Sequence, residues 1–236
     1  MIDIHTHTLP HIDDGSESVE ESLKMLEMQV KQGVDTVIAT PHFYIDRAEP
    51  NDFLEKRRNA AEKLKKGLEN VSERPRMALG AEVQFYSELH SLERLDEFCF
   101  SGTKYVLVEM PFAKWSRYTY QALGLLYLDR GITPVIAHLE RYISYQDDDV
   151  IEKLIDANAL IQINSSTITA RATRRKALAL VRSGAVCFVA SDSHGAEHRR
   201  PDLGDGYKII TKKLGDEVLD RLEFWEYKVK KHLVTF

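Results

Sequence analysis

The sequence has little cysteine, no long apolar run and no excess of positive charge. Two cysteines in 236 residues cannot form a disulfide framework, so we expect a reducing, cytoplasmic setting. No run approaches the roughly 18 apolar residues of a membrane span, and no basic segment followed by an apolar one marks a signal peptide, so we expect no membrane insertion. The formal charge of −5 and the pI near 6.0 argue against a nucleic-acid-binding protein.

Two common phosphate-handling motifs are also missing. A cysteine-dependent tyrosine phosphatase needs an arginine at position +6 from its cysteine, but Tyr105 follows Cys99 and Ser193 follows Cys187 at that spacing. We therefore expect both cysteines to be small apolar core residues. No glycine-rich nucleotide-binding loop occurs either, because Gly80 and Gly102 are isolated.

The pattern that is present is a repeated unit of helix, Gly or Asn stop, continuous apolar strand and polar residue. Ser18 and Glu21 have the spacing of a capping box, and the helix that they begin is predicted to end at about Gln32, before Gly33. Further helices are predicted near 52–70, 117–130, 147–157, 171–183 and 215–232. Strands are predicted at 1–7, 34–40, 76–85, 105–110, 132–138, 159–164 and 185–192, while 86–104 has no clear pattern.

Continuous apolar strands that alternate with helices indicate a parallel sheet with a covered outer face. Neither a flexible linker nor a change of composition divides the chain, so residues 1–236 are predicted to form a single domain. Seven such strands favour an α/β fold of the closed or nearly closed (β/α)7 barrel type, a distorted relative of the TIM barrel. An open doubly wound sheet is the alternative.

The first strand carries two histidines, His5 and His7. Residues i and i+2 of a strand share a face, so both imidazoles would project the same way, about 6.5 Å apart. Such a pair is suited to a metal ion. Read alone, the segment could equally be a solvated terminus with incidental histidines.

Other metal-ligand side chains stand at the carboxyl ends of the predicted strands, where parallel α/β folds build their active sites. A lone histidine at such a position is more often a hydrogen-bonded core residue, so the joint pattern carries the prediction. The set is too large for one ion and fits two or three divalent ions. It consists of His5, His7, Asp14, His42, Glu82, Glu109, His138, Asp192 and His194.

The four remaining histidines fall outside this pattern. His11 and His198 lie in loops on the same side and could touch a substrate, whereas His90 and His232 read as surface residues. Aromatic residues near the predicted rim could pack a phenyl ring, although some must be structural. They are Phe43, Tyr44, Phe112, Trp115 and Tyr118.

Eight short motifs, in order along the chain, resemble those of a known family. They are His5-Thr-His7, Asp13-Asp14-Gly15, Thr40-Pro-His42, Gly80-Ala-Glu82, Glu109 after an apolar strand, Ile136-Ala-His138-Leu-Glu-Arg141, Ile163-Asn164-Ser-Ser and Ala190-Ser-Asp192-Ser-His194. Together they resemble the polymerase and histidinol phosphatase (PHP) superfamily of metallohydrolases. Within it, they are similar to the CpsB/YwqE-type tyrosine phosphatases of bacterial capsule and exopolysaccharide gene clusters.

This resemblance implies a PHP-type barrel with three divalent ions, usually manganese, with iron, zinc, cobalt or magnesium as alternatives. It assigns His5, His7, Glu82 and Asp192 to one ion. Glu82 would bridge to a second ion held by His42 and His138. Asp14, Glu109 and His194 would hold the third.

The resemblance also implies that Arg141 contacts phosphate, together with a second arginine after the last histidine. The spacing favours Arg199 for that role, and the following proline favours Arg200. Leu139 and Gly195 depart from the family pattern, where proline and asparagine are frequent. Neither position is a ligand in the family.

The activity implied is a metal-dependent protein tyrosine phosphatase acting on the phosphotyrosine tail of a bacterial tyrosine kinase that regulates polysaccharide export. Two alternatives stay open. One is a phosphatase of small molecules such as histidinol phosphate, and the other is a metal-binding regulatory module without turnover. The sequence specifies no oligomeric state.

Overall fold

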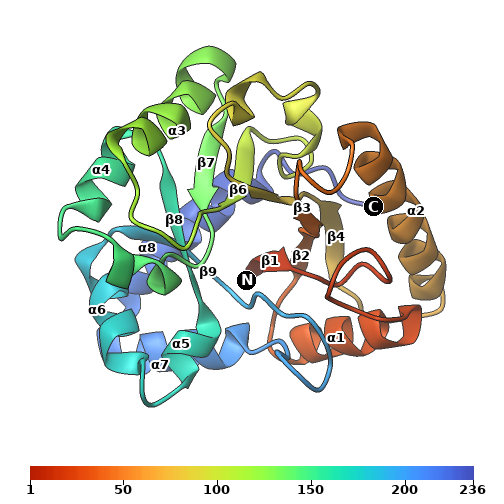
Figure 1. Ribbon diagram of the computed structural model, residues 1–236. Helices are drawn as coiled ribbons and strands as arrows, with labels where there is room; N and C mark the ends of the chain where they lie inside the picture. Colours follow the sequence, from red (N-terminus) through yellow and green to blue (C-terminus); the bar gives the residue numbers. More distant parts are fainter.

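The computed structural model describes residues 1–236 and places a ring of strands inside a ring of helices (Figure 1). All strand pairs are parallel, as the continuous apolar segments predict. The strands are β1 (Ile2–Thr6), β2 (Thr36–Ala39), β3 (His42–Phe43), β4 (Arg76–Leu79), β5 (Glu82–Gln84), β6 (Tyr105–Glu109), β7 (Thr133–Ile136), β8 (Leu160–Asn164) and β9 (Val186–Ala190).

The predicted strand 76–85 is interrupted and forms β4 and β5, and a short strand that was not predicted, β3, follows the predicted strand 34–40. The strands therefore divide into two sheets. One sheet has the order β1-β2-β4 and the other β3-β5-β6-β7-β8-β9. Pro41, which has no N–H for the ladder, lies between β2 and β3, and Gly80 lies between β4 and β5. A Cβ on Gly80 would lie 3.0 Å from the Phe100 ring, so a side chain there would require the ring to shift. Pairing then resumes with His42 opposite Glu82.

The last strand meets the first at the carboxyl-terminal rim. The Asp192 N–H donates to the His5 carbonyl and the His7 N–H donates to the Ser193 carbonyl, both at 2.9 Å. The only bridge between the two edges is a single parallel one, between Thr6 and Ser193, and the Ser191 N–H also donates to Asp3 Oδ1 at 3.0 Å. Strands from β5 to β9 lie in sequence order around the ring, with none of the order reversal of a doubly wound sheet. The predicted barrel-type α/β fold is confirmed, with a narrow seam between β9 and β1.

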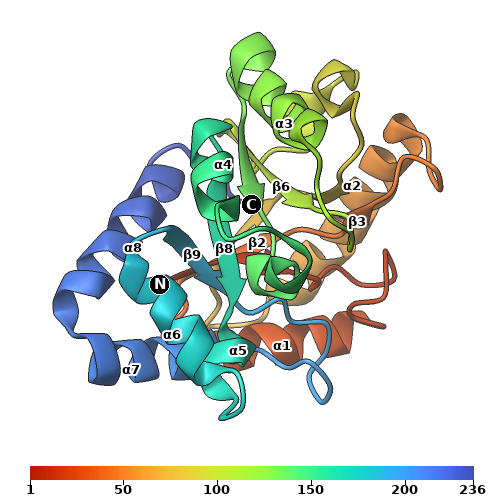
Figure 2. The ribbon, with the colours of Figure 1, turned by 60° about the vertical axis from the view of Figure 1, so that its left-hand side comes forward.

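Helices cover the outer side of the strands in both views (Figures 1 and 2). None combines the length and the apolar character that crossing a membrane requires. The helices are α1 (Val19–Lys31), α2 (Pro50–Leu68), α3 (Arg117–Arg130), α4 (Val150–Asp156), α5 (Ser165–Thr169), α6 (Arg174–Ser183), α7 (Leu203–Leu214) and α8 (Asp216–Lys230). The segment 86–104 holds two 3-10 helices, at Leu89–Ser91 and Leu95–Glu97.

Helix α1 begins and ends where its sequence signals predict. The Ser18 hydroxyl accepts a hydrogen bond from the Glu21 N–H at 3.1 Å, as in a capping box. The Glu21 carboxylate, however, accepts from the Glu17 N–H at 2.8 Å and not from the cap residue itself. Gly33 follows the helix with a φ of 87°, a left-handed conformation that favours glycine.

Helix α7 was not predicted, because Gly204 and Gly206 are poor helix formers and follow Pro201. Both glycines are instead required by close packing. A Cβ on Gly204 would lie 2.5 Å from the Gln32 carbonyl oxygen, and one on Gly206 would lie 3.0 Å from the Ser165 Cβ. Tertiary contact outweighs local propensity here.

The strands are packed on both faces, which determines where their last side chains point. In β6, Val106 and Val108 belong to the larger apolar core, whereas Leu107 belongs to a second, smaller core. Glu109 shares the face of Leu107, because side chains alternate along a strand. The same alternation in β8 places Gln162 and Asn164 opposite the face that Ile161 and Ile163 bury in the larger core.

Candidate metal centre

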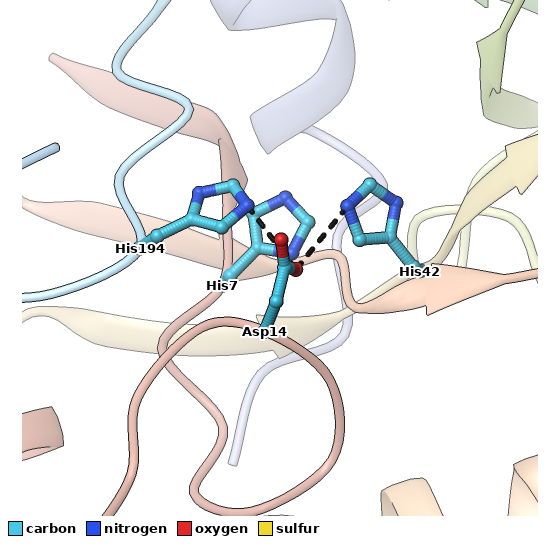
Figure 3. Close-up of side chains that lie close together, drawn as sticks. All are labelled: His7, Asp14, His42 and His194. Atoms are coloured by element: carbon cyan, nitrogen blue, oxygen red, sulfur yellow. Dashed lines mark ion pairs between the residues drawn. The ribbon is translucent and has the colours of Figure 1, made fainter.

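The nine predicted metal ligands gather at one rim of the barrel. They come from seven places in the fold, so the centre exists only when the whole ring has formed. Figure 3 shows four of them, with His7, His42 and His194 around the Asp14 carboxylate. His5 lies in β1, His7 just after it, Asp14 in the loop before α1, His42 in β3, Glu82 in β5, Glu109 at the end of β6, His138 after β7, and Asp192 and His194 after β9.

Glu82 lies at the middle of the cluster and is fully buried. Its Oε2 atom is 3.1 Å from His5 Nε2, 3.3 Å from His7 Nε2 and 3.0 Å from His42 Nδ1. The other oxygen, Oε1, is 2.9 Å from His138 Nε2. One carboxylate therefore faces four imidazoles, which is the arrangement expected of a bridging ligand.

Asp192 extends the cluster across the seam of the barrel. Its Oδ1 atom lies 3.4 Å from His5 Nε2 and 3.6 Å from both His7 Nε2 and His194 Nδ1. The backbone of Asp192 has a φ of 52°, a left-handed conformation that aspartate tolerates better than most residues. Residues at the two edges of the seam thus contribute to one cluster.

Asp14 closes the outer side of the cluster. Its Oδ1 atom is 3.5 Å from His42 Nε2 and 3.4 Å from His194 Nε2 (Figure 3). The Asp14 side chain is 65% exposed, whereas Glu82 beneath it is inaccessible to solvent. The centre therefore runs from the barrel interior to the surface.

The structure groups the donors differently from the arrangement that the resemblance implies. The resemblance places Glu109 with Asp14 and His194, but in the structure Glu109 groups with Glu82 and His42. His42 also groups with Asp14, His7 and His194. Each group has donor atoms within 4.8 Å of one another. The groups are His7, Asp14, His42 and His194; His5, His138 and Asp192; His5, His7 and Glu82; and His42, Glu82 and Glu109.

Several buried polar atoms of the cluster lack a hydrogen-bond partner. They are His42 Nδ1, His138 Nδ1, His194 Nε2 and Glu82 Oε2. Glu82 Oε2 is close to three ring nitrogens, but none is aligned for a hydrogen bond. An orphaned buried polar atom costs about 1–3 kcal/mol, so four in one cluster call for a ligand. Imidazole and carboxylate donors without thiolate suit a divalent first-row ion.

The pKa values in the cluster follow from burial and charge together. Burial raises the pKa of Glu82, but its contacts with His5 and His138 outweigh this and hold it well below its usual range. Burial also raises the pKa of Glu109 to about 7, with a further contribution from the negative charge of Glu82. A divalent ion would favour the ionised form of both carboxylates.

Asp13 is a functional candidate that sequence reasoning missed. Its Oδ2 atom lies 2.7 Å from His7 Nδ1 and accepts the His42 N–H at 3.0 Å. Burial alone would lower the pKa of His7, but Asp13 raises it to about 10. A carboxylate on Nδ1 leaves Nε2 of His7 facing the cluster. The signal for Asp13 in the sequence is its place beside the predicted ligand Asp14, in a loop that contains Gly15.

Two of the three predicted arginines reach the cluster. Arg141 Nη2 donates to Asp192 Oδ2 at 2.5 Å, and Arg199 Nη2 lies 2.8 Å from Asp192 Oδ1. Their side chains are 35% and 43% exposed, so both guanidinium groups also face solvent. Arg200 lines a cavity with Arg199 and Asp202 but makes no ion pair with a predicted ligand. Between the two alternatives from the sequence, the geometry favours Arg199.

A cavity of about 440 Å³ adjoins the cluster at His42 and Asp14. The Tyr44 ring stacks on the His42 imidazole with 5.2 Å between centroids, and the Arg47 guanidinium lies 4.5 Å from the Tyr44 centroid. Lys56 also lines this cavity. It therefore offers an aromatic surface and two cations next to the candidate centre.

The other residues singled out from the sequence are distributed as follows. His11 and His198 line other cavities, His198 together with Asp14 and His194, and neither belongs to a metal group. Phe43 and Trp115 are buried in the core, while Phe112 and Tyr118 are exposed. The prediction that both cysteines are core residues is confirmed, and burial raises the pKa of Cys187 to about 11.

A parallel barrel with imidazoles and carboxylates at its carboxyl-terminal rim is the architecture of a metal-dependent hydrolase. The chain matches the family model described as capsular polysaccharide synthesis, CpsB/CapC, over residues 1–228 and belongs to that family. The predicted family is therefore confirmed.

Named relatives agree with this placement. The tyrosine-protein phosphatase YwqE of Bacillus subtilis is 32% identical over 225 residues, which cover 92% of this chain and 87% of YwqE. The tyrosine-protein phosphatase CpsB of Streptococcus agalactiae is 31% identical over 233 residues, 94% of either chain.

Solved structures give the same result. One chain, from work on YwqE of Bacillus subtilis and CpsB of Streptococcus pneumoniae as metal-dependent tyrosine phosphatases, matches with a TM-score of 0.85. Identity is 30%, with coverage of 100% of this chain and 97% of that one. A zinc-bound histidinol phosphate phosphatase of Lactococcus lactis has a TM-score of 0.53 at 15% identity, covers 90% and 94% of the two chains, and supports the fold alone. The predicted enzyme class, a metal-dependent phosphatase, is confirmed.

Proposed function

We propose that this protein is a manganese-dependent phosphatase that hydrolyses phosphotyrosine on a protein substrate. The observation that carries the proposal is the buried cluster of imidazoles and carboxylates with unpartnered donor atoms. Relatives of similar length that are named tyrosine-protein phosphatases support the choice of phosphoester.

The nine donors would hold three ions, with manganese as the proposed metal. His7, Asp14, His42 and His194 form the outer group, and two of the three inner groups contain Glu82. Divalent ions bound there would lower the pKa of a water so that hydroxide is available to attack phosphorus near neutral pH, and would neutralise charge on the phosphoryl oxygens. Asp13 orients His7 for this purpose through its Nδ1 atom.

Arg141 and Arg199 would bind the phosphoryl group. Each contacts Asp192 through one Nη2 atom and has further N–H donors on a partly exposed guanidinium. A guanidinium binds two phosphoryl oxygens at once, and that interaction strengthens as charge develops in the transition state. The arginines would therefore orient the phosphate and stabilise the transition state.

The cavity beside His42 would receive the phenyl ring of the substrate. Tyr44 presents its ring there, and Phe53 and Ile12 add apolar surface. Burial and the nearby Glu109 raise the pKa of the Tyr44 hydroxyl, so it stays a neutral aromatic partner. Stacking of this kind contributes about 0.5–1.5 kcal/mol beyond surface burial.

The proposed substrate is the phosphotyrosine tail of a bacterial tyrosine kinase that regulates polysaccharide export. The family description, capsular polysaccharide synthesis, supports this process. The exposed Asp14 carboxylate supports a protein substrate, because a phosphotyrosine on a flexible tail reaches a centre that opens to the surface.

A substrate panel tests the proposal. With added manganese, the protein is expected to hydrolyse a phosphotyrosyl peptide, and a chelator is expected to abolish the activity. Hydrolysis of histidinol phosphate alone would contradict the proposed substrate, whereas activity that resists chelation would contradict the metal mechanism.

Two histidine variants provide a matched pair. His138→Ala removes a buried donor that faces Glu82, so most of the activity should be lost. His232→Ala changes an exposed histidine outside the metal groups and should leave activity unchanged. Equal activity of both variants would exclude His138 from the site.

A further inference from the structure

Strand β8 contributes none of the nine donors, yet its two polar side chains are buried beneath the centre. Gln162 is 0% exposed and Asn164 is 2% exposed. Both belong to a hydrogen-bonded chain that links His138, His5 and Asp192. We propose that Gln162 and Asn164 are positioning residues that determine which nitrogen of His5 and which oxygen of Asp192 face the metal centre.

A backbone group sets the direction of the first half of the chain. The His138 N–H can only donate, and it lies 2.8 Å from one terminal atom of the Gln162 side chain. That atom must therefore be the carbonyl oxygen Oε1 and not the amide nitrogen. His5 Nδ1 lies 3.2 Å from the same oxygen, so it must carry the proton and donate.

This assignment decides how His5 acts as a ligand. With a proton on Nδ1, the neutral imidazole has its lone pair on Nε2. Nε2 is the atom that lies 3.1 Å from Glu82 Oε2 and 3.4 Å from Asp192 Oδ1. Gln162 thus presents the unprotonated nitrogen of His5 to the cluster.

The second half of the chain follows from the first. Once Oε1 of Gln162 is assigned, its Nε2 must donate to Asn164 Oδ1, 2.9 Å away. The Asn164 amide is then oriented with Nδ2 toward Asp192 Oδ2, to which it donates at 2.7 Å. Arg141 donates to the same oxygen. Asp192 Oδ1 is the oxygen left facing His5 and His7.

One backbone N–H on the segment after β7 therefore orients ligands at both edges of the seam. Hydrogen bonds of this type to metal ligands typically change metal affinity by about 10–100-fold when removed. The inference rests on the proposed metal centre. Its test measures binding and ring protonation, so it stays separate from the question of which phosphoester is hydrolysed.

The test uses full-length protein and three variants. Gln162→Met removes the three hydrogen bonds of the Gln162 side chain, Gln162→Glu keeps the acceptor for His138 and His5, and Asn164→Leu breaks the link to Asp192. Manganese affinity is measured by calorimetry. The His5 ring N–H is followed by nuclear magnetic resonance of the protein loaded with zinc, which is diamagnetic.

We expect Gln162→Met and Asn164→Leu to bind manganese about 10–100-fold more weakly than the wild-type chain. The hydrogen-bonded Nδ1–H signal of His5 should be present in the wild-type chain, in Gln162→Glu and in Asn164→Leu. It should be absent from Gln162→Met, which has no acceptor. Manganese affinity that is unchanged in both Gln162→Met and Asn164→Leu would overturn the proposal. A hydrogen-bonded His5 Nδ1–H signal that persists in Gln162→Met would also overturn it.

Gln29→Met is the matched control for loss of a buried amide. Gln29 is 0% exposed and donates to Asp3 Oδ2 at 2.9 Å, without contacting a predicted ligand. Gln29→Met and Gln162→Met should both lower the thermal stability of the metal-free protein, but Gln29→Met should leave manganese affinity unchanged. If both variants lose stability and neither loses affinity, Gln162 has only a structural role and the proposal is wrong.

Discussion

Replacement of Gly15 by alanine should disturb the metal centre by a steric clash with His7. Gly15 follows Asp14 in the loop that passes over β1. A Cβ built on it would lie 2.3 Å from the His7 carbonyl oxygen and 2.4 Å from the His7 Cβ. The φ of Gly15 lies outside the left-handed range, so alanine is disfavoured by contact and not by backbone conformation.

The size of the effect follows from these distances. Ordinary van der Waals contact begins at 3.4 Å, so the loop and His7 must separate by about 1 Å. The Ser16 N–H, which donates to the same carbonyl at 3.0 Å, would lose its partner. A displacement of about 1 Å typically costs about 100-fold in activity, and overpacking costs about 1–3 kcal/mol of stability.

Turnover of a phosphotyrosyl peptide, manganese content and Tm should be measured for Gly15→Ala and for Gly124→Ala. A Cβ on Gly124, inside α3, would meet nothing within 4 Å. This control should keep full activity and gain up to about 1 kcal/mol of stability, because alanine favours a helix over glycine. Wild-type turnover and metal content in Gly15→Ala would refute the reasoning.

Three further predictions follow from the site and the charges around it. Arg199→Ala should lower kcat/KM for a phosphotyrosyl peptide by on the order of 100-fold, whereas Arg200→Ala should change it little; the reverse order would assign the phosphate to Arg200. Removal of metal by a chelator should lower the Tm, because an ion that binds only the folded chain stabilises it, and an unchanged Tm would contradict a metal centre in the fold. Burial opposes ionisation of Asp35, but Thr36 and Lys230 outweigh it and lower its pKa, so Asp35 stabilises the fold above its unfolded pKa of about 4 and this contribution is lost as the pH falls through the folded value. The stability difference between the wild-type chain and Asp35→Asn should therefore shrink on acidification in chemical unfolding, and a constant difference would contradict this linkage.

The strands and their terminal donors could be predicted because the signal is local. Apart from the first, each predicted strand follows or precedes a glycine, asparagine or proline, and the carboxyl ends of parallel strands meet at one rim. Glu82 and Glu109 were found in this way without knowledge of their partners. The helix α3 was predicted over its observed range because its end is also marked locally, by Gly131.

Features that depend on contacts between distant segments could not be predicted. Helix α7 has glycines that local propensity rejects, and only its packing against Gln32 and Ser165 explains them. The grouping of His42 with Asp14 depends on where a loop crosses the rim. The sequence gives no signal for Gln162, an uncharged residue in an apolar strand, because its position is defined by contacts with His5 and His138.

The seam between β9 and β1 has a consequence for how this barrel holds together. Few backbone bonds join the two edges, yet His5 and His7 on one side face Asp192 and His194 on the other. An ion shared across the seam would act as a cross-link between the first and last strands, closing almost the whole chain into one loop. Metal loss would then loosen the barrel at this edge first, so amide exchange in β1 and β9 would report occupancy of the centre.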